Sequence, residues 1–293
     1  MIYENPLAYV LGLEGVALLR AFTGEHDREF VDARIDEIRR LLDDRSLAEA
    51  AVDVARVDTV EGYRIWSQTY DGPNSTFAFD EPIVREIVGT LPVGEALDAA
   101  CGTGRFAQFL AGRGHRVTGV DSSPDMLARA GKRVPEGEFL LGELTRLPLP
   151  DDAVDLVTCS LALTHVPSLE PVLAEFARVL RPGGHVVISD IHPEGVARGV
   201  VPPVRLPDGR PGRVATYHHR IGDYVRAALG AGLQVRRCDE PRLPVADSPE
   251  PAAPATLGPW EVWPWCLGDL VPEAARAATA GVPAIVVWHL QSA

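Results

Sequence analysis

The sequence predicts an α/β protein with a doubly wound, Rossmann-like sheet of seven mostly parallel strands, the last one antiparallel, and an N-terminal helical appendage. Two observations carry this prediction. From about residue 80 onward, short apolar runs alternate with stretches of helical periodicity, as in βαβ units. In addition, a glycine-rich turn at 101–104 joins the first apolar run to a helical stretch. With 46% hydrophobic and 24% charged residues among 293, the composition excludes a disordered chain.

Seven apolar runs are expected to form the strands of this sheet: 95–101, 115–121, 138–142, 154–160, 185–191, 233–239 and 284–290. Four intervening stretches are expected to be helices: 105–112, 124–133, 169–180 and 220–231. The third helix should stop at the turn Arg181-Pro182-Gly183-Gly184, because proline and glycine end helices. These alternating elements imply helices on both faces of one sheet.

Residues 1–62 are predicted to form the helical appendage, with no strand of their own, and residues 63–293 the Rossmann-like domain. Two segments interrupt that domain. The first, 192–218, is a predicted hairpin lid, because a Pro- and Gly-rich turn separates two β-prone runs. The second, 241–272, is rich in Pro and Trp and is expected to be an ordered insertion that either lines a substrate pocket or packs as a plug. The sequence leaves open whether the N-terminal helices cover the site or form a homodimer.

Charge and cysteine content restrict the partners and the location. Lys and Arg number 28 against 41 for Asp and Glu, a net charge of −13 with no basic block, so nucleic acid and anionic membranes are disfavoured partners. There is no apolar run of about 18 residues, so no membrane span is expected. The four cysteines lie far apart and without metal-ligand spacing, which predicts no metal site and a cytoplasmic protein.

The glycine turn carries the strongest chemical signal. Gly102 and Gly104 allow the backbone a tight turn and a close approach by a nucleoside ligand. The same residues fit a dinucleotide fold, which is the first competing interpretation. Asp98, near the end of the preceding strand, argues against it, since a carboxylate would repel a pyrophosphate and a buried one without a partner is costly. A cationic or zwitterionic ligand is therefore expected.

Two further acids follow the next strands of the predicted sheet. Asp121 closes the second strand, where an acid can accept both ribose hydroxyls in either fold, so it does not discriminate between them. Glu143 follows the third strand, where its carboxylate could accept from an adenine amine beside the free amide of Leu144. Together they predict a site that binds an adenine nucleoside.

With these features in place, the sequence resembles the class I S-adenosylmethionine-dependent methyltransferases, in particular the small-molecule group similar to the ubiquinone and menaquinone methyltransferases. The motifs that carry the resemblance are DAACGTG at 98–104, VDSSPDML at 120–127, GELTRLP at 142–148, VDLVTCSLALTHV at 154–166 and VLRPGG at 179–184. The resemblance covers roughly residues 65–240 and, more weakly, the last strand. It implies S-adenosyl-L-methionine as cofactor and S-adenosyl-L-homocysteine as product.

The resemblance also implies cofactor-binding residues. Those expected along the methionine part, with the Asp98 carboxylate near its ammonium group, are Asp98, Ala100, Gly102, Gly104, Ser160, His165 and Tyr70. Those expected along the ribose and adenine are Asp121, Ser122, Met126, Glu143 and Leu144. Tyr70 shares one helical face with Tyr63 and Trp66, and this aromatic face fits core packing as well as a lid.

Fewer features of the sequence indicate which residues would act on the methyl acceptor. Methyl transfer needs alignment and, for many acceptors, a base, and histidine suits that task near neutral pH. The resemblance matches Tyr217 and His219 to a Tyr-x-His pair of this group, so we interpret His219, His165 and Tyr217 as catalytic candidates. A helix-capping structural role for His219 is the alternative. His192 and Asp190 are too few for a metal site.

The sequence thus predicts methyl transfer from S-adenosyl-L-methionine to a small, hydrophobic or aromatic metabolite, with a slight preference for an oxygen or carbon acceptor. One alternative is a non-methylating protein or a cyclase that keeps the same pocket. A nicotinamide-dependent oxidoreductase fits less well, because the chain shows no Tyr-x-x-x-Lys motif and no metal set.

Overall fold

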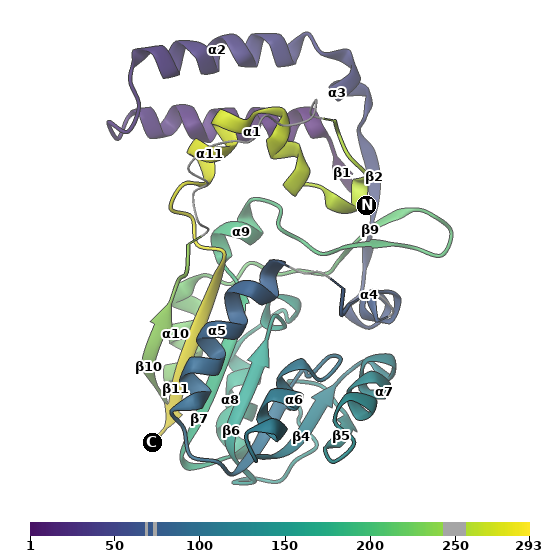
Figure 1. Ribbon diagram of the computed structural model, residues 1–293, viewed down its shortest axis with the longest axis vertical. Coiled ribbons are helices and arrows are strands. Elements are labelled where there is room, and N and C mark those ends of the chain that lie inside the picture. Colours follow the sequence, from purple (N-terminus) through teal and green to yellow (C-terminus); the bar gives the residue numbers. More distant parts are fainter. Residues whose placement is uncertain (68–69, 73–74, 243–255) are drawn as a thin grey trace. The chain divides into compact units, whose positions relative to one another are not determined.

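The computed structural model describes residues 1–67, 70–72, 75–242 and 256–293 (Figure 1). The chain divides into two compact units. The Rossmann-like unit comprises Asp58–Arg198, Ala215–Arg242 and Pro283–Ala293. The helix-rich unit comprises Met1–Val57, Gly199–Val214 and Leu243–Val282. Each unit is therefore assembled from three separate stretches of sequence.

The Rossmann-like unit is built on a seven-stranded sheet of order β10-β11-β7-β6-β3-β4-β5. Its strands are β3 (Glu95–Ala99), β4 (Arg116–Asp121), β5 (Glu138–Leu141), β6 (Val154–Ser160), β7 (Leu180–Ile191), β10 (Leu233–Asp239) and β11 (Ile285–Ser292). All neighbours pair in parallel except β11, which runs antiparallel to both β7 and β10. The predicted fold class is confirmed.

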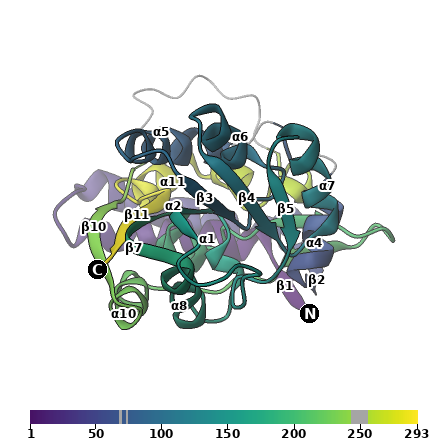
Figure 2. The same ribbon diagram turned by 90° about the horizontal axis from the view of Figure 1, so that it is seen from below.

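Helices cover both faces of this sheet. The helices of this unit are α4 (Thr59–Trp66), α5 (Ser75–Gly89), α6 (Arg105–Gly112), α7 (Pro124–Arg133), α8 (Glu170–Val179), α9 (Pro193–Ala197) and α10 (Ile221–Gly230), with a 3₁₀ turn η1 (Leu163–His165). Seen from below, α5 and α6 lie on one side of the sheet and α8 and α10 on the other (Figure 2). The carboxyl ends of β3, β4 and β6 therefore meet at one edge, between the helix layers.

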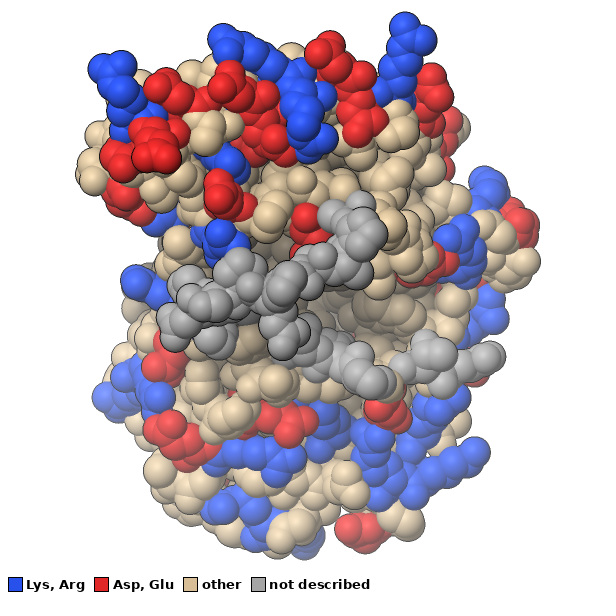
Figure 3. Space-filling model, turned by 45° about the horizontal axis from the view of Figure 1, so that its top comes forward, with Lys and Arg blue, Asp and Glu red and all other residues tan. Residues whose placement is uncertain are grey.

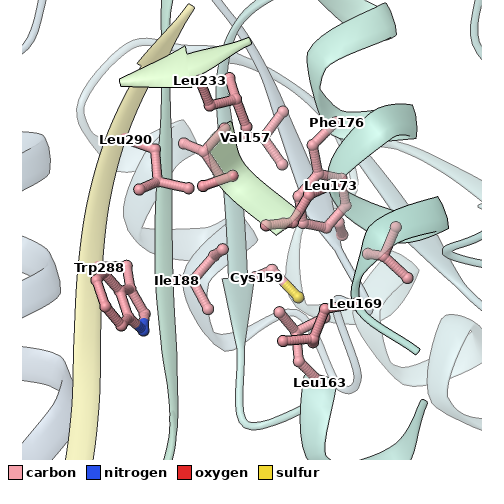
Figure 4. Close-up of a cluster of buried hydrophobic side chains, with 14 of the residues drawn as sticks. Val157, Cys159, Leu163, Leu169, Leu173, Phe176, Ile188, Leu233, Trp288 and Leu290 are labelled. Atoms are coloured by element: carbon pink, nitrogen blue, oxygen red, sulfur yellow. The ribbon is translucent and has the colours of Figure 1, made fainter. Parts of the chain in front are cut away.

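The core of this unit consists of one apolar cluster on each face of the sheet. Neighbouring residues of a strand enter opposite clusters: Leu97 packs under α8 and α10, while Ala96 packs under α5 and α6. Phe176 and Leu173 of α8 point toward the sheet residue Val157 (Figure 4). Strands buried on both faces read as continuous apolar runs, which explains why they could be found in the sequence.

The helix-rich unit contains β1 (Ile2–Glu4), α1 (Pro6–Ala21), α2 (Arg28–Leu42), α3 (Arg45–Glu49), β2 (Val52–Val57), β8 (Pro203–Arg205), β9 (Pro211–Val214), 3₁₀ turns η2 (Trp260–Val262) and η3 (Trp265–Leu270), and α11 (Pro272–Thr279). The expectation of an N-terminal region without strands is wrong, because β1 and β2 join β9 and β8 in a four-stranded sheet. Strands β8 and β9 form an antiparallel hairpin within the segment 192–218.

The core of the helix-rich unit joins α1 to the second half of the Pro- and Trp-rich segment. Val10, on α1, shares a cluster with Trp260, Trp263 and Ala274. Trp260 and Trp263 are buried, whereas Trp265 is 53% exposed. The first two tryptophans thus have a packing role. The first part of that segment, 243–255, lies outside the described residues.

The exposed face of α2 carries charges of both signs. Arg39 pairs with Asp36 at 2.7 Å and Arg40 pairs with Glu37, in each case three residues earlier on the same helix. Acidic and basic side chains are interspersed in the same way at the top of Figure 3. This mixture is typical of a helix face that solvent covers.

One charged cluster lies within the apolar core of the helix-rich unit. Glu14 of α1 is fully buried, and its Oε1 lies 3.5 Å from Nη1 of Arg34 on α2. Nη2 of Arg34 makes a shorter ion pair of 2.7 Å with Glu273 on α11. Oε2 of Glu14 has no hydrogen-bond partner among the described residues. Burial raises the pKa of Glu14 to about 7, an effect that Arg34 only partly offsets.

Candidate functional site

The turn after β3 has an unusual backbone. Ala100, Gly102 and Gly104 all have positive φ, at 54°, 54° and 83°. For Ala100, which has a Cβ, this conformation costs roughly 1–2 kcal/mol. Leu161, which follows the neighbouring strand β6, also has a positive φ of 55°. Strained residues at the ends of two adjacent strands are typical of a functional edge.

The two glycines of this turn differ in what surrounds them. A Cβ on Gly104 would lie 3.1 Å from both Cα and Cβ of Ala130, so this glycine is required for packing α6 against α7. A Cβ on Gly102 would have only Cε1 of Tyr70 within 4 Å, at 3.9 Å. Gly102 therefore presents open backbone toward Tyr70, which suits the close approach of a ligand.

Asp121, at the end of β4, is oriented by the glycine turn. Its Oδ2 accepts a hydrogen bond of 2.8 Å from the amide of Gly102, and its Oδ1 accepts one of 2.8 Å from the amide of Ser123. Burial raises the pKa of this carboxyl. A carboxylate has about four acceptor positions, so these amides leave part of its capacity for hydroxyl donors. This arrangement fits the predicted binding of both ribose hydroxyls, with the half-buried Ser122 beside it.

Asp98 is better explained by the structure than by the sequence. The residue is 2% exposed, and its Oδ2 accepts from the amide of Ala107 at 2.9 Å while its Oδ1 accepts from Oγ1 of Thr158 at 2.8 Å. The assumption that this acid lacks structural partners is wrong, since it joins β3 to α6 and β6. Burial raises its pKa to about 6. Contact with the ammonium group of a cofactor stays a prediction.

The residues assigned to adenine differ in accessibility. The carboxylate of Glu143 is exposed and has no hydrogen-bond partner among the described residues, and Leu144 is half-buried. Both are open to a ligand. Met126, by contrast, has no exposed surface, because it packs into the interior from α7. An adenine contact from Met126 would require its side chain to move, so that role also stays a prediction.

A polar clasp holds Tyr70 and Asp71 over the glycine turn. Oδ1 of Asp71 accepts from Oγ1 of Thr103 at 2.6 Å, and Arg133 of α7 donates to Thr103 at 3.0 Å and pairs with Asp71 at 2.8 Å. Thr103 is 1% exposed. Burial raises the pKa of Tyr70 to about 12, so its phenol is neutral at physiological pH. The clasp thus holds Asp71 on the glycine turn, and the ring of the adjacent Tyr70 lies near Gly102.

Replacing Asp71 by Asn should weaken cofactor binding about fivefold, because a charge-assisted hydrogen bond in a partly exposed clasp is worth roughly 1 kcal/mol. The measurement is calorimetric titration with S-adenosyl-L-homocysteine. Glu136→Gln, at an exposed position after α7, serves as the control and should leave the affinity unchanged. Equal affinities for the two variants would contradict a binding role for the clasp.

The loop after β6 forms the other side of the candidate site. Oγ of Ser160 is buried and has no hydrogen-bond partner among the described residues. This fits a hydroxyl that forms a hydrogen bond with a bound ligand. His165 follows on η1. Its Nδ1 lies 2.7 Å from the carbonyl of Ala215, and its Nε2 lies 2.9 Å from the hydroxyl of Tyr63 on α4. Burial lowers the pKa of His165.

The structure brings the segment 215–219 onto this loop, as the acceptor prediction requires. The amide of Tyr217 donates to the carbonyl of Thr164 at 2.7 Å, and Nε2 of His219 donates to the carbonyl of Val166 at 2.8 Å. The latter bond supports the structural alternative for His219, since only Nδ1 remains for a base. The side chain of Tyr217 is 40% exposed. Its catalytic role stays a prediction, like that of His219.

Sequence reasoning misses three residues of this region. Asp71 and Tyr63 stand out only as parts of an aromatic segment, because their partners are distant in the chain. Asp190, at the end of β7, stands out only as an incomplete metal ligand set. It is fully buried and accepts from the amide of Thr164 at 2.7 Å and from the hydroxyl of Tyr224 at 3.3 Å. Burial raises its pKa to about 6. The described residues hold no cluster of three or more His, Cys, Asp or Glu placed for a metal.

Comparison with known families identifies the part of the chain that carries the glycine turn. Residues 97–188 match the model of a family described as a methyltransferase domain. This segment is a methyltransferase domain. It contains the end of β3 and all of β4, β5 and β6, and Asp98, Asp121, Glu143 and His165 all lie inside it.

Curated relatives match about a third of the chain. A malonyl-[acyl-carrier protein] O-methyltransferase of Serratia marcescens is 42% identical over 100 residues, which are 34% of this chain and 39% of that protein. A demethylmenaquinone methyltransferase of Renibacterium salmoninarum is 38% identical over 112 residues, 38% of this chain and 47% of that protein. The chain thus spans less than half the length of each relative.

Solved structures match over a larger part of the chain. An S-adenosylmethionine-dependent methyltransferase from Mesorhizobium loti covers 72% of this chain and 96% of its own, with 24% identity and a TM-score of 0.50. The DhpI–SAH complex covers 80% of this chain and 94% of its own, with 21% identity and a TM-score of 0.54. At this identity the likeness establishes the fold. The resemblance to class I methyltransferases is confirmed, and the predicted cofactor agrees with these matches.

Proposed function

We propose that this chain transfers a methyl group from S-adenosyl-L-methionine to a small, hydrophobic or aromatic molecule and releases S-adenosyl-L-homocysteine. The observation that carries the proposal is the pairing of Gly102 with Asp121. The glycine has open space on its exposed face, and the acid bonded to its amide keeps acceptor capacity for a hydroxyl donor. The curated relatives, which are named as methyltransferases, support the reaction type.

The electrostatics of the site favour a cationic ligand. Burial raises the pKa of Asp98 to about 6 and also raises the pKa of Asp121. A positively charged sulfur nearby would stabilise both carboxylates, whereas the pyrophosphate of a dinucleotide would destabilise them further. This supports the methyl donor over a nicotinamide coenzyme.

Each side of the site has a distinct task in this proposal. S-adenosyl-L-methionine supplies, when bound, a methyl group activated by a positively charged sulfur. Asp121 binds the ribose hydroxyls, the backbone of Gly102 permits close approach, and Tyr70 covers the turn. The loop after β6 orients the acceptor with Ser160 and His165. Because transfer is an in-line displacement, this alignment is the main contribution of the protein.

The experiment combines binding and turnover on the full chain. Calorimetry with S-adenosyl-L-homocysteine should show micromolar or tighter binding, and NADH should show none. Methyl-labelled S-adenosyl-L-methionine is then incubated with 1,4-naphthohydroquinone, catechol, a malonyl thioester and benzylamine. Label in any organic product supports transfer. Tight binding without labelled product would favour the alternative of a non-methylating protein or cyclase, and NADH binding alone would refute the proposal.

The relatives leave the acceptor open, because each shares less than half its length with this chain. A cytoplasmic location is likewise our proposal from the sequence. The helices that the structure describes include none with the length and apolarity needed to span a membrane. A homodimer through α1 and α2 stays an alternative that size-exclusion chromatography with light scattering would decide.

A further inference from the structure

Tyr63 forms an unexpected link between the two sides of the candidate site. It lies on α4, with its ring 6.0 Å from that of Tyr70 and 5.4 Å from that of His165 in an edge-on arrangement. Its hydroxyl lies 2.9 Å from Nε2 of His165. Tyr63 therefore stands between the residue above Gly102 and the histidine after β6.

The hydrogen bonds determine which nitrogen of His165 carries a proton. A backbone carbonyl can only accept, so Nδ1 must be protonated to bond Ala215 at 2.7 Å. Burial lowers the pKa of His165, which keeps the ring neutral near pH 7. In the neutral ring Nε2 is then the acceptor. The hydroxyl of Tyr63 consequently donates to Nε2, and the lone pairs of its oxygen remain for another donor.

The charges around this pair are negative. The charged groups that act on the Tyr63 phenol are the carboxylates of Asp121 and Asp190, and burial together with them raises the pKa of Tyr63 far above its ordinary value. Among the described residues, no Lys or Arg contributes to the ionisation of Tyr63 or His165. An acceptor that arrives as an anion would be repelled here, and one that arrives with its proton would not.

We propose that Tyr63 and His165 form a proton relay that removes a proton from the methyl acceptor, so that the acceptor is a neutral hydroxyl compound. The acceptor O–H bond breaks and its proton goes to the oxygen of Tyr63, while the original phenolic proton goes to Nε2 of His165. The methyl group takes the place of that proton on the acceptor oxygen. The positive charge brought by the cofactor ends on the imidazolium, which stays bonded to Ala215 and then releases its proton to water.

This inference rests on the proposed function, and it adds a residue and a substrate property to it. A relay is needed for a phenol or hydroquinone, whose proton must leave. It is not needed for a carboxylate, which is ionised at neutral pH. The relay thus separates two kinds of acceptor that the names of the relatives leave open.

The first test needs no acceptor. In protein labelled with ¹⁵N-histidine, and with His165 assigned through His165→Gln, the ring should be neutral with its proton on Nδ1 from pH 6.5 to 9. The Nε2 resonance should shift in Tyr63→Phe, which keeps the ring and loses the donor. A charged His165 ring at pH 7, or an Nε2 resonance that does not shift in Tyr63→Phe, would overturn the relay whatever the protein methylates.

The second test compares acceptors. With 1,4-naphthohydroquinone, Tyr63→Phe should lower kcat by about 10²–10⁴-fold, as expected for a lost proton-transfer group, with KM and the affinity for S-adenosyl-L-homocysteine within about twofold. The acid limb of the pH–rate profile, which the wild type should show, should be absent in Tyr63→Phe. Tyr3→Phe, at a tyrosine that is 68% exposed, is the matched control and should behave as the wild type.

The outcomes distinguish the relay from the proposed function. Transfer to the malonyl thioester but not to the hydroquinone would overturn the relay and leave methyl transfer standing. Transfer to the hydroquinone with normal kcat in Tyr63→Phe would reduce Tyr63 to a packing residue. Cofactor binding without transfer to any acceptor would contradict the proposed function, and the relay would fall with it even if the hydrogen bond is present.

Discussion

Replacing Gly102 by Ala should reduce the affinity for S-adenosyl-L-homocysteine by about a hundredfold, which corresponds to roughly 2.7 kcal/mol. The new Cβ would occupy the open space that Gly102 presents toward Tyr70, where only one atom lies within 4 Å. The protein should still fold, since Ala100 already adopts the same φ of 54° two residues earlier. The backbone conformation should cost about 1–2 kcal/mol of folding free energy.

Gly183→Ala is the matched control for this variant. Gly183 has a φ of +78°, and nothing would lie within 4 Å of a Cβ added there, so the substitution brings the same backbone cost. It lies near the start of β7, whose other end reaches the site. Calorimetry should show normal affinity for Gly183→Ala and a similar melting temperature for both variants. Equal affinity in both would refute the cofactor role of Gly102.

Replacing Glu14 by Gln should raise the free energy of unfolding of the helix-rich unit by about 1–3 kcal/mol at pH 8. Burial raises the pKa of Glu14 from 4.5 to about 7, so the folded state binds a proton that the unfolded state has released between these values. The wild type therefore loses stability as pH rises from about 4.5 through 7. The variant, which cannot ionise, should not show this loss.

The substitution of Glu14 by Gln should leave no neighbouring charge without a partner. Arg34 keeps its 2.7 Å ion pair with Glu273 when the charge of Glu14 is removed, so no buried cation is left alone. The other groups that act on Glu14 are Glu37, which raises its pKa, and Arg40, which lowers it. Urea denaturation at pH 5 and pH 8 measures the effect. Glu29→Gln, exposed on α2, should be neutral at both, and a gain for Glu14→Gln that is independent of pH would contradict the explanation.

The Rossmann-like sheet could be predicted from the sequence because its strands are local signals. The predicted strand 233–239 coincides with β10, and the alternation of strands and helices fixed the class. Strand β7 begins earlier than expected, at Leu180, because Leu180 pairs with Val154 across a register shift and the predicted turn is absorbed into the strand. Turn residues alone could not reveal that pairing.

The strands of the helix-rich unit could not be predicted, because their partners are distant in the chain. Strand β2 is only six residues long and its sequence, VDVARV, does not keep a strict alternation of apolar and polar residues, while its neighbour β9 begins at Pro211. A run this short carries little periodicity. Only tertiary pairing gives such a segment the conformation of a strand.

Some residues of the candidate site could likewise be predicted from the sequence, and others could not. The glycine turn could be found because it is a contiguous motif, and Asp121 could be found because it closes the next predicted strand at a recognisable spacing. The bond between Tyr63 and His165 spans 102 positions, and the one between Asp71 and Thr103 spans 32. No spacing rule connects such residues. The same holds for Asp98, whose partner Thr158 is 60 residues away and whose burial the sequence therefore leaves unexplained.

The assembly of the helix-rich unit from three stretches has a consequence for biosynthesis. Helix α1 is synthesised long before α11, yet it packs against α11, which begins at Pro272. During translation the apolar side of α1 cannot pack against α11 until the residues between the two helices have been synthesised. A nascent polypeptide of this kind is exposed to aggregation for as long as its late segment is missing, so the helix-rich unit can be completed only after α11 has been synthesised.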